Sequence, residues 1–91
     1  MYRIKFAPDY RDELADLDKR FPGLEQKLQG GVYFSLLGAP RDGHLQGDTD
    51  IWYMNQGIEG GRFLVKVYYR IRERPKTVTP LSILVIDRTV M

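Results

Sequence analysis

Cations and a tyrosine alternate with apolar residues in the segment 62–71. Successive side chains of a strand point to opposite faces, so the polar positions of this segment share one face. These positions are Arg62, Lys66, Tyr68 and Arg70. Lysine and arginine bind phosphates, and aromatic rings stack on unpaired bases. A cation can also stabilise the charge on a phosphorane, while lysine, arginine or tyrosine can move protons at the reacting oxygens. The segment therefore indicates a polyanion-binding surface and allows RNA cleavage without a metal.

The opposite face of the same segment is apolar and predicts burial. It consists of Phe63, Val65, Val67, Tyr69 and Ile71. Such a strand suits a sheet that helices cover on one side only, with the cationic side left open. Arg88 ends the neighbouring expected strand, and we expect it to face the scissile phosphate together with Lys66. The alternative is a structural role, in which Arg88 pairs with an acid such as Asp87 or Asp50.

Charge is unevenly distributed along the 91 residues, although the formal net charge is only +2. Residues 1–61 contain 7 Lys and Arg against 10 Asp and Glu, a balance of −3. Residues 62–91 contain 7 against 2, a balance of +5. This asymmetry indicates an anionic partner for the C-terminal strands. The alternative is that lysine and arginine only keep the strand edges soluble.

Several kinds of functional site find little support in the sequence. The chain contains no cysteine, which excludes disulfides and thiolate chemistry. The single histidine, His44, is expected in a loop without a second metal ligand at a useful spacing. The pairs Gly30-Gly31 and Gly60-Gly61 match neither a P-loop nor a dinucleotide fingerprint. We therefore expect neither a metal nor a small-molecule cofactor.

The length and the hydropathy of the chain favour one small domain in the cytoplasm. Ninety-one residues suit a single domain, which we expect over residues 1–91. No apolar run approaches the roughly 20 residues that span a bilayer. The start, Met1-Tyr2-Arg3-Ile4-Lys5, contains no apolar signal core after its charges.

Hydrophobic periodicity and breaker residues predict the element order β-α-α-β-β-β. The first helix begins at Pro8 and ends before Pro22-Gly23, and the second begins near Pro22. Gly30-Gly31 falls inside this second helix, so the helix either bends there or ends early and resumes. The expected strands cover residues 2–7, 51–54, 62–72 and 81–88, with a polar loop at 38–50 and turns at 56–61 and 73–79. We expect an α+β fold with two helices packed on one face of a twisted antiparallel four-stranded sheet.

Several segments together carry a family resemblance. They are Tyr2-Arg3-Ile4-Lys5-Phe6-Ala7-Pro8, Leu14-Ala15-Asp16-Leu17-Asp18-Lys19, Ala39-Pro40-Arg41, His44-Leu45-Gln46-Gly47, Val67-Tyr68-Tyr69-Arg70-Ile71 and Leu84-Val85-Ile86-Asp87-Arg88. With them, the chain resembles the RelE/ParE superfamily of toxins from type II toxin–antitoxin systems. The likeness covers most of the chain and rests on the order of elements, on a Pro-Arg…Leu-x-Gly loop, and on an arginine that closes the last strand.

The resemblance implies two helices on a twisted antiparallel sheet and one of two activities. RelE-like members cut mRNA in the ribosomal A site, whereas ParE-like members poison DNA gyrase. The leading expectation is a ribosome-dependent, metal-independent endoribonuclease that inhibits translation. The alternatives are a gyrase inhibitor without enzymatic activity and an inactive relative that only binds a partner. The implied partners are a cognate antitoxin, and either the ribosome with its mRNA or gyrase.

The resemblance also implies roles for individual residues. In RelE-like members, basic residues on the second and third strands, an arginine ending the fourth strand and a tyrosine just beyond it carry the cleavage. The third-strand cation falls on Lys66 and the fourth-strand arginine on Arg88. Tyr53 and Asn55 stand at the positions of the second-strand lysines, and the downstream tyrosine and terminal helix have no counterpart before Met91.

Two tyrosines are the expected substitutes for the missing catalytic groups. Tyr53 and Tyr68 could serve in proton transfer or in base stacking, although tyrosine is a weak base near neutral pH. Arg41, Arg62 and Arg70 are expected to contact the nucleic acid. The expected catalytic set is therefore Lys66, Arg88, Tyr53 and Tyr68.

Overall fold

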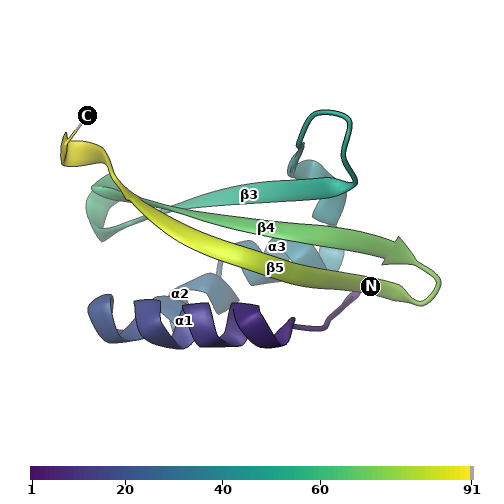
Figure 1. Ribbon diagram of the computed structural model, residues 1–91, viewed down its shortest axis with the longest axis horizontal. Coiled ribbons are helices and arrows are strands. Elements are labelled where there is room, and N and C mark those ends of the chain that lie inside the picture. Colours follow the sequence, from purple (N-terminus) through teal and green to yellow (C-terminus); the bar gives the residue numbers. More distant parts are fainter. Residues whose placement is uncertain (91) are drawn as a thin grey trace.

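The computed structural model describes residues 1–90, which form three α-helices and five strands. The helices are α1 (Pro8–Arg20), α2 (Leu24–Gln29) and α3 (Val32–Gly38). The strands are β1 (Arg3–Ile4), β2 (His44–Leu45), β3 (Ile51–Ile58), β4 (Phe63–Glu73) and β5 (Lys76–Asp87). Short 3-10 turns cover Pro40–Asp42, Glu59–Gly61 and Arg88–Val90. The three helices lie on one side of the twisted sheet (Figure 1).

The sheet has five strands in the order β1-β5-β4-β3-β2. The three long strands β3, β4 and β5 form an antiparallel meander, as the sequence predicts. The α+β class, with helices on one face of the sheet, is confirmed. Two details differ from the expected four antiparallel strands. β1 runs parallel to β5 at one edge, and the expected polar loop contributes β2 at the other edge.

The second expected helix is divided at Gly30-Gly31 into α2 and α3, so it ends early and resumes. The Gln56 side chain from β3 fills the break between them. Its Oε1 accepts a hydrogen bond from the N–H of Val32 at 3.0 Å, and its Nε2 donates to the Lys27 carbonyl at 3.1 Å. A Cβ at Gly31 would lie 2.6 Å from the Gln56 side-chain carbon, so a larger residue there would displace the Gln56 amide from this break. β3 thereby supplies a partner for the first turn of α3.

Two strands are longer than the sequence pattern predicts. β3 continues to Ile58 instead of ending near residue 54, and β5 begins at Lys76 instead of near residue 81. Pro80 argues against a strand in the sequence, because proline cannot donate to a ladder. It is tolerated here because the register between β4 and β5 shifts beside it, as at a β-bulge.

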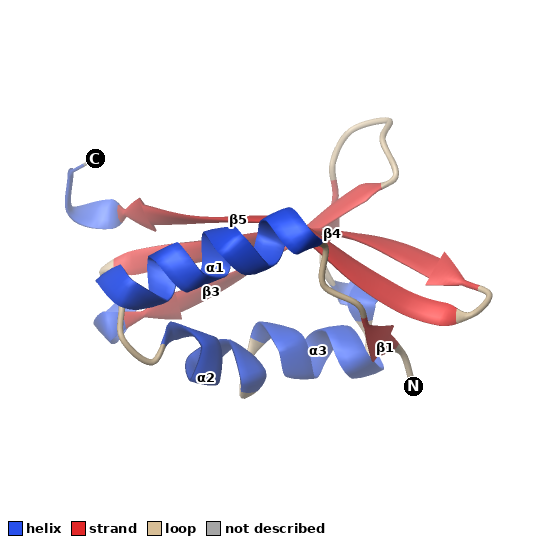
Figure 2. Cartoon of the chain, turned by 60° about the horizontal axis from the view of Figure 1, so that its bottom comes forward, coloured by secondary structure: helices blue, strands red, loops and turns tan. Residues whose placement is uncertain are grey.

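The helix-covered face of the sheet and the apolar sides of the helices form the core (Figure 2). Val65, Val67 and Tyr69 of β4 are fully buried there, as the alternation predicts. Ile71, nearer the end of β4, is only partly buried. The other buried apolar residues are Tyr10, Leu14, Leu24, Leu28, Val32, Tyr33, Leu36, Ile58, Val78 and Ile83. Because the helices cover one face of the sheet, Lys66 and Tyr68 of β4 and their β3 partners Asn55 and Tyr53 are displayed on the other.

Candidate functional site

The face of the sheet away from the helices carries aromatic side chains side by side on three strands. The register pairs His44 of β2 with Tyr53 of β3, and Tyr53 with Tyr68 of β4. The ring centroids of His44 and Tyr53 lie 5.1 Å apart, and those of Tyr53 and Tyr68 lie 5.9 Å apart. His44 is exposed and the two tyrosines are half-buried, so a ligand can reach all three. We call His44, Tyr53 and Tyr68 the aromatic row.

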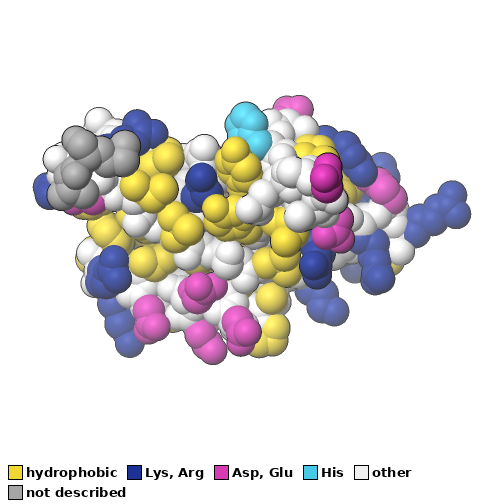
Figure 3. Space-filling view, turned by 45° about the horizontal axis from the view of Figure 1, so that its top comes forward, with side chains coloured by type: hydrophobic (Ala, Val, Ile, Leu, Met, Phe, Trp, Pro, Cys, Tyr) yellow, Lys and Arg dark blue, Asp and Glu magenta, His cyan; other side chains and the backbone are white. Residues whose placement is uncertain are grey.

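Lys66 brings a positive charge to the aromatic row. Its ammonium nitrogen lies 4.6 Å from the centroid of the Tyr53 ring, within the range in which a ring face attracts a cation. Lys66 pairs with Asn55 in β3 and with Leu84 in β5. It is half-buried and Arg70 is exposed, which confirms the expected register of β4. Figure 3 shows on this face a cation among hydrophobic side chains, close to the histidine.

Contacts at the start of β2 hold the backbone before His44. A Cβ at Gly43 would lie 2.7 Å from the Tyr53 carbonyl oxygen, so glycine allows β2 to approach β3 closely. The Tyr69 hydroxyl, on the buried side of the sheet, donates to the Pro40 carbonyl at 2.5 Å. Burial raises the pKa of Tyr69 to about 12, so its hydroxyl remains a donor near neutral pH. The imidazole therefore stands on an anchored edge strand.

The position of His44 corrects the sequence-based expectation. The sequence predicts a polar loop over residues 38–50, whereas His44–Leu45 forms an edge strand antiparallel to β3. The sequence feature that indicates this strand is the turn pair Gly47-Asp48, which stands between the short segment at His44 and the strand that begins at Ile51. Gly47 adopts a φ of 56°, a conformation that glycine tolerates. His44 is thus the member of the site that the sequence interpretation missed.

Arg62 and Arg88 lie at the end of the sheet where β4 begins and β5 ends. The guanidinium of Arg62 pairs with the Asp87 carboxylate at 3.9 Å. The backbone N–H of Arg88 donates to the Arg62 carbonyl at 2.9 Å, and the exposed Arg88 begins a 3-10 turn. Arg88 lies four residues beyond the β5 partner of Lys66, a separation of roughly 13 Å along an extended strand. The structure does not bring Arg88 into the aromatic row.

The two acids considered as partners of Arg88 have other partners. The Asp87 carboxylate accepts bonds from the hydroxyl and the backbone N–H of Thr89 at 2.6 and 2.9 Å, and these bonds lower its pKa. Asp50 lies 3.3 Å from Nε of Arg70. Within residues 1–90, Arg88 forms an ion pair with neither acid. Arg70 is exposed and remains on the face that carries the aromatic row.

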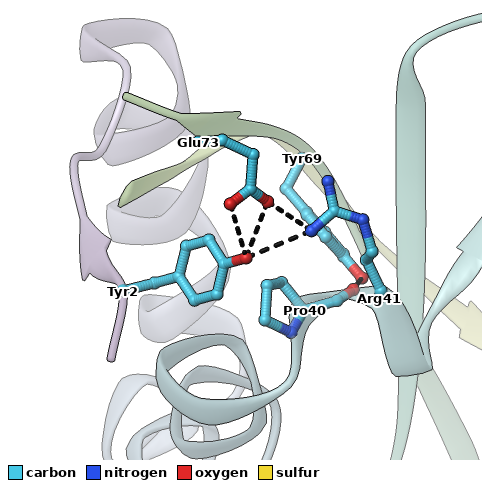
Figure 4. A network of polar contacts seen from close by, with 5 residues as sticks. All are labelled: Tyr2, Pro40, Arg41, Tyr69 and Glu73. Atoms are coloured by element: carbon cyan, nitrogen blue, oxygen red, sulfur yellow. Dashed lines mark hydrogen bonds and ion pairs between the residues drawn. The ribbon is translucent and has the colours of Figure 1, made fainter. Parts of the chain in front are cut away.

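Arg41 lies in a polar network with Tyr2 and Glu73 (Figure 4). The Tyr2 hydroxyl donates to Oε1 of Glu73 at 2.7 Å, and the Arg41 guanidinium donates to the Tyr2 hydroxyl oxygen at 3.1 Å. Arg41 also pairs with the Glu73 carboxylate. The network joins the start of the chain, the turn before β2 and the end of β4. Arg41 is therefore held at the end of β4 opposite to Arg88, away from the aromatic row.

This network makes the ionisation of Glu73 testable. The hydrogen bond from Tyr2 and then that from Arg41 lower the pKa of Glu73 below its ordinary value of 4.5. Because the folded-state pKa is lowered, the network stabilises the fold above about pH 4.5, and this contribution is lost as the pH falls through the folded-state pKa. An NMR titration should show that Tyr2→Phe raises the pKa of Glu73. An unchanged pKa in a normally folded Tyr2→Phe variant would contradict the network.

Other features of the described chain concern its core and its surroundings. The hydroxyls of Tyr10 and Tyr33 share a buried hydrogen bond of 2.6 Å, and burial raises the pKa of both tyrosines.

Among residues 1–90, no three side chains of the metal-binding types lie close enough to hold an ion. No helix in this range has the length and apolar character needed to cross a membrane.

Comparison with known proteins identifies the fold of the chain. No protein-family model and no curated protein matches the chain. The crystal structure of the isolated E. coli RelE toxin superposes on 97% of this chain and 87% of the toxin, with a TM-score of 0.70 and 15% identity. The fold is that of a RelE toxin. The solution structure of the conserved hypothetical protein HP0892 from Helicobacter pylori matches 98% of this chain and 97% of its own, with a TM-score of 0.59 and 17% identity.

The RelE-like fold confirms the architecture that the resemblance implies. On its open face, Tyr53 and Asn55 of β3 stand where the resemblance implies lysines, and they pair with Tyr68 and Lys66 of β4. This RelE-like sheet therefore presents an aromatic row and one half-buried lysine where the resemblance implies several basic residues. His44 adds an imidazole to the same place.

Proposed function

We propose that this chain is the toxin of a type II toxin–antitoxin system and that it cleaves mRNA on the ribosome. The observation that carries the proposal is the aromatic row with the Lys66 ammonium 4.6 Å from the Tyr53 ring centroid, on the face opposite the helices. Ring faces suit unpaired bases, and a neighbouring cation suits a phosphate. The RelE-like fold supports the assignment as a toxin.

The side chains of the row suit cleavage by the 2′-hydroxyl of the RNA itself. This hydroxyl loses its proton to a base, attacks the adjacent phosphorus and displaces the 5′-oxygen of the next nucleotide, which takes a proton from an acid. The products are a 2′,3′-cyclic phosphate and a 5′-hydroxyl. Imidazole is the side chain best suited to proton transfer near neutral pH, which assigns this role to His44. Lys66 stabilises the charge that builds on the phosphorane.

Tyr53 and Tyr68 hold the substrate in this scheme. Their rings are half-buried between the imidazole and the rest of the sheet, and each can stack on an unpaired base. Either hydroxyl can also relay a proton beside Lys66. Because their rings lie 5.9 Å apart, one nucleotide can contact both tyrosines.

The proposal includes the ribosome because the aromatic row is exposed. Cleavage without a metal requires the 2′-oxygen, the phosphorus and the leaving oxygen to be held in line, and such alignment supplies a large part of the rate enhancement. A row of side chains on an open sheet holds a flexible strand weakly. A larger body that fixes the message would supply the alignment that the small domain lacks.

A cognate antitoxin and a cytoplasmic location belong to the same proposal. Leu84, the β5 partner of Lys66, is 38% exposed, so apolar surface lies beside the cation. An acidic, amphipathic antitoxin segment would cover both. Expression of the chain alone should arrest growth, and expression with the neighbouring open reading frame should relieve the arrest.

In vitro translation followed by primer extension on the message tests the proposed activity. The purified chain should stop translation and produce new 5′-hydroxyl ends at the codon in the ribosomal A site. The same message without ribosomes should remain largely intact. If translation stops without new RNA ends, or does not stop, the nuclease proposal fails. Inhibition of DNA gyrase supercoiling is then measured with the same preparation, because gyrase is the alternative target that the resemblance implies.

A further inference from the structure

A basic groove lies beyond the aromatic row. It runs between the β1–α1 connection, the second half of β4 and the first half of β5. Its volume is about 530 Å³. The cations that line it are Lys5, Arg70 and Arg72, and its side-chain hydroxyls are those of Thr77 and Thr79. Ammonium, guanidinium and hydroxyl groups are the donors that bind phosphate oxygens.

The register of the sheet brings these groups together. Arg70 pairs with Thr79, and Arg72 pairs with Thr77, so each guanidinium-bearing residue stands opposite a hydroxyl-bearing one. The Lys5 backbone N–H donates to the carbonyl of Val78 at 2.9 Å, which keeps Lys5 beside β5 after β1 has ended. Residues from three separate stretches of the chain therefore line one groove.

Two cations of the groove follow the aromatic row along β4. Arg70 and Arg72 follow Tyr68 at alternate positions, and alternate residues of a strand share a face. The strand rise places Arg70 roughly 7 Å and Arg72 roughly 13 Å beyond Tyr68. A single strand of RNA that stacks on the row can thus continue along β4 into the groove.

The charge of the groove favours an anion. Asp50 is the one acid among its lining residues, which leaves a formal charge of +2 against three cations. Its carboxylate lies 3.3 Å from Nε of Arg70, in a pair whose members are 77% and 55% exposed. Exposed pairs of this kind are weak, so a phosphate can compete for Arg70. Lys5 and Arg72 form no ion pair within residues 1–90, and both are exposed.

We propose that this groove binds backbone phosphates of the RNA strand whose bases occupy the aromatic row. The inference rests on the proposed function, because it takes single-stranded RNA as the substrate. Contacts of this kind position the strand and do not read its sequence. The groove would hold nucleotides on one side of the cleavage point and so limit how far the strand can slide over Lys66.

Salt-dependent binding of uncleavable 2′-O-methyl oligoribonucleotides tests the groove. For a strand of about eight nucleotides, a length within the range that such surfaces bind, Lys5→Ala/Arg72→Ala should weaken binding. The slope of log K against log salt should also fall by about 1.4, the value for two lost phosphate contacts on a single strand. A dinucleotide reaches only the aromatic row and should bind both proteins with the same slope. The matched control is Lys19→Ala/Lys27→Ala, which removes the same charge from the helical layer and should bind as the wild type does.

An unchanged slope for the longer strand in the double variant would overturn the groove proposal. Equal competition by polyglutamate and by RNA of the same charge would also overturn it and would indicate an acidic protein segment as the ligand. Circular dichroism melting shows whether each variant is folded. The result is separate from the cleavage assay. If new RNA ends form but the salt slope of the double variant is unchanged, only the groove proposal is wrong. If the salt slope falls but no new RNA ends form, only the nuclease proposal is wrong.

Discussion

Replacing Lys66 with methionine should slow cleavage of mRNA on the ribosome about 10²- to 10³-fold, which corresponds to about 2.7–4 kcal/mol of transition-state stabilisation. The ammonium is already held 4.6 Å from the Tyr53 ring centroid before any substrate arrives. As the 2′-oxygen adds to phosphorus, negative charge grows on the phosphorane oxygens. A cation that is fixed in advance stabilises this charge with little reorganisation, whereas methionine of similar length stabilises none of it.

The rate is measured in single turnover on stalled ribosomes by primer extension. Lys66→Arg keeps the positive charge and should retain more activity than Lys66→Met. Lys19→Met, on the exposed side of α1, is the matched control and should cleave at the wild-type rate. Arg88→Ala should cost less than Lys66→Met, since Arg88 lies roughly 13 Å further along the sheet. Equal rates for Lys66→Met and Lys19→Met would show that Lys66 does not stabilise the reacting phosphate.

The placement of Lys66 was predictable because β4 has one buried face. Val65, Val67 and Tyr69 can only be covered together in one register, and that register puts Lys66 and Arg70 on the other face. Information of this kind is local and periodic. The same reasoning yields the helix-covered face of the sheet. The low helix propensity of Gly30-Gly31 separately indicates a bend or an interruption of the second helix, and the structure shows the interruption.

Relations between distant segments could not be predicted in this way. Tyr53 and Tyr68 become neighbours through the register between β3 and β4, which no single segment specifies. Arg41 is expected to contact the nucleic acid, and no local pattern indicates that it also pairs with Glu73, 32 residues away in the sequence. β1 finds its partner in the last strand, and a two-residue β2 is too short to show a period. His44 was missed for this last reason.

The second large effect is expected at His44. His44→Ala should slow cleavage about 10²- to 10⁴-fold, the range for loss of a positioned general acid or base. Cleavage on the ribosome is measured in single turnover, with Leu45→Ala as the control. Leu45 lies on the same edge strand and is 49% exposed, so its loss tests the strand without touching the imidazole.

Addition of free imidazole separates a chemical role of His44 from a structural one. A small molecule that diffuses into the space left by His44→Ala can accept and donate protons but cannot restore a packing contact between His44 and Tyr53. Imidazole should therefore raise the rate of His44→Ala in proportion to its concentration and leave the wild type and Leu45→Ala unchanged. Rescue would place proton transfer at the edge of the aromatic row. A slow variant that imidazole does not rescue would instead show that His44 only supports the Tyr53 ring and that another group moves the proton.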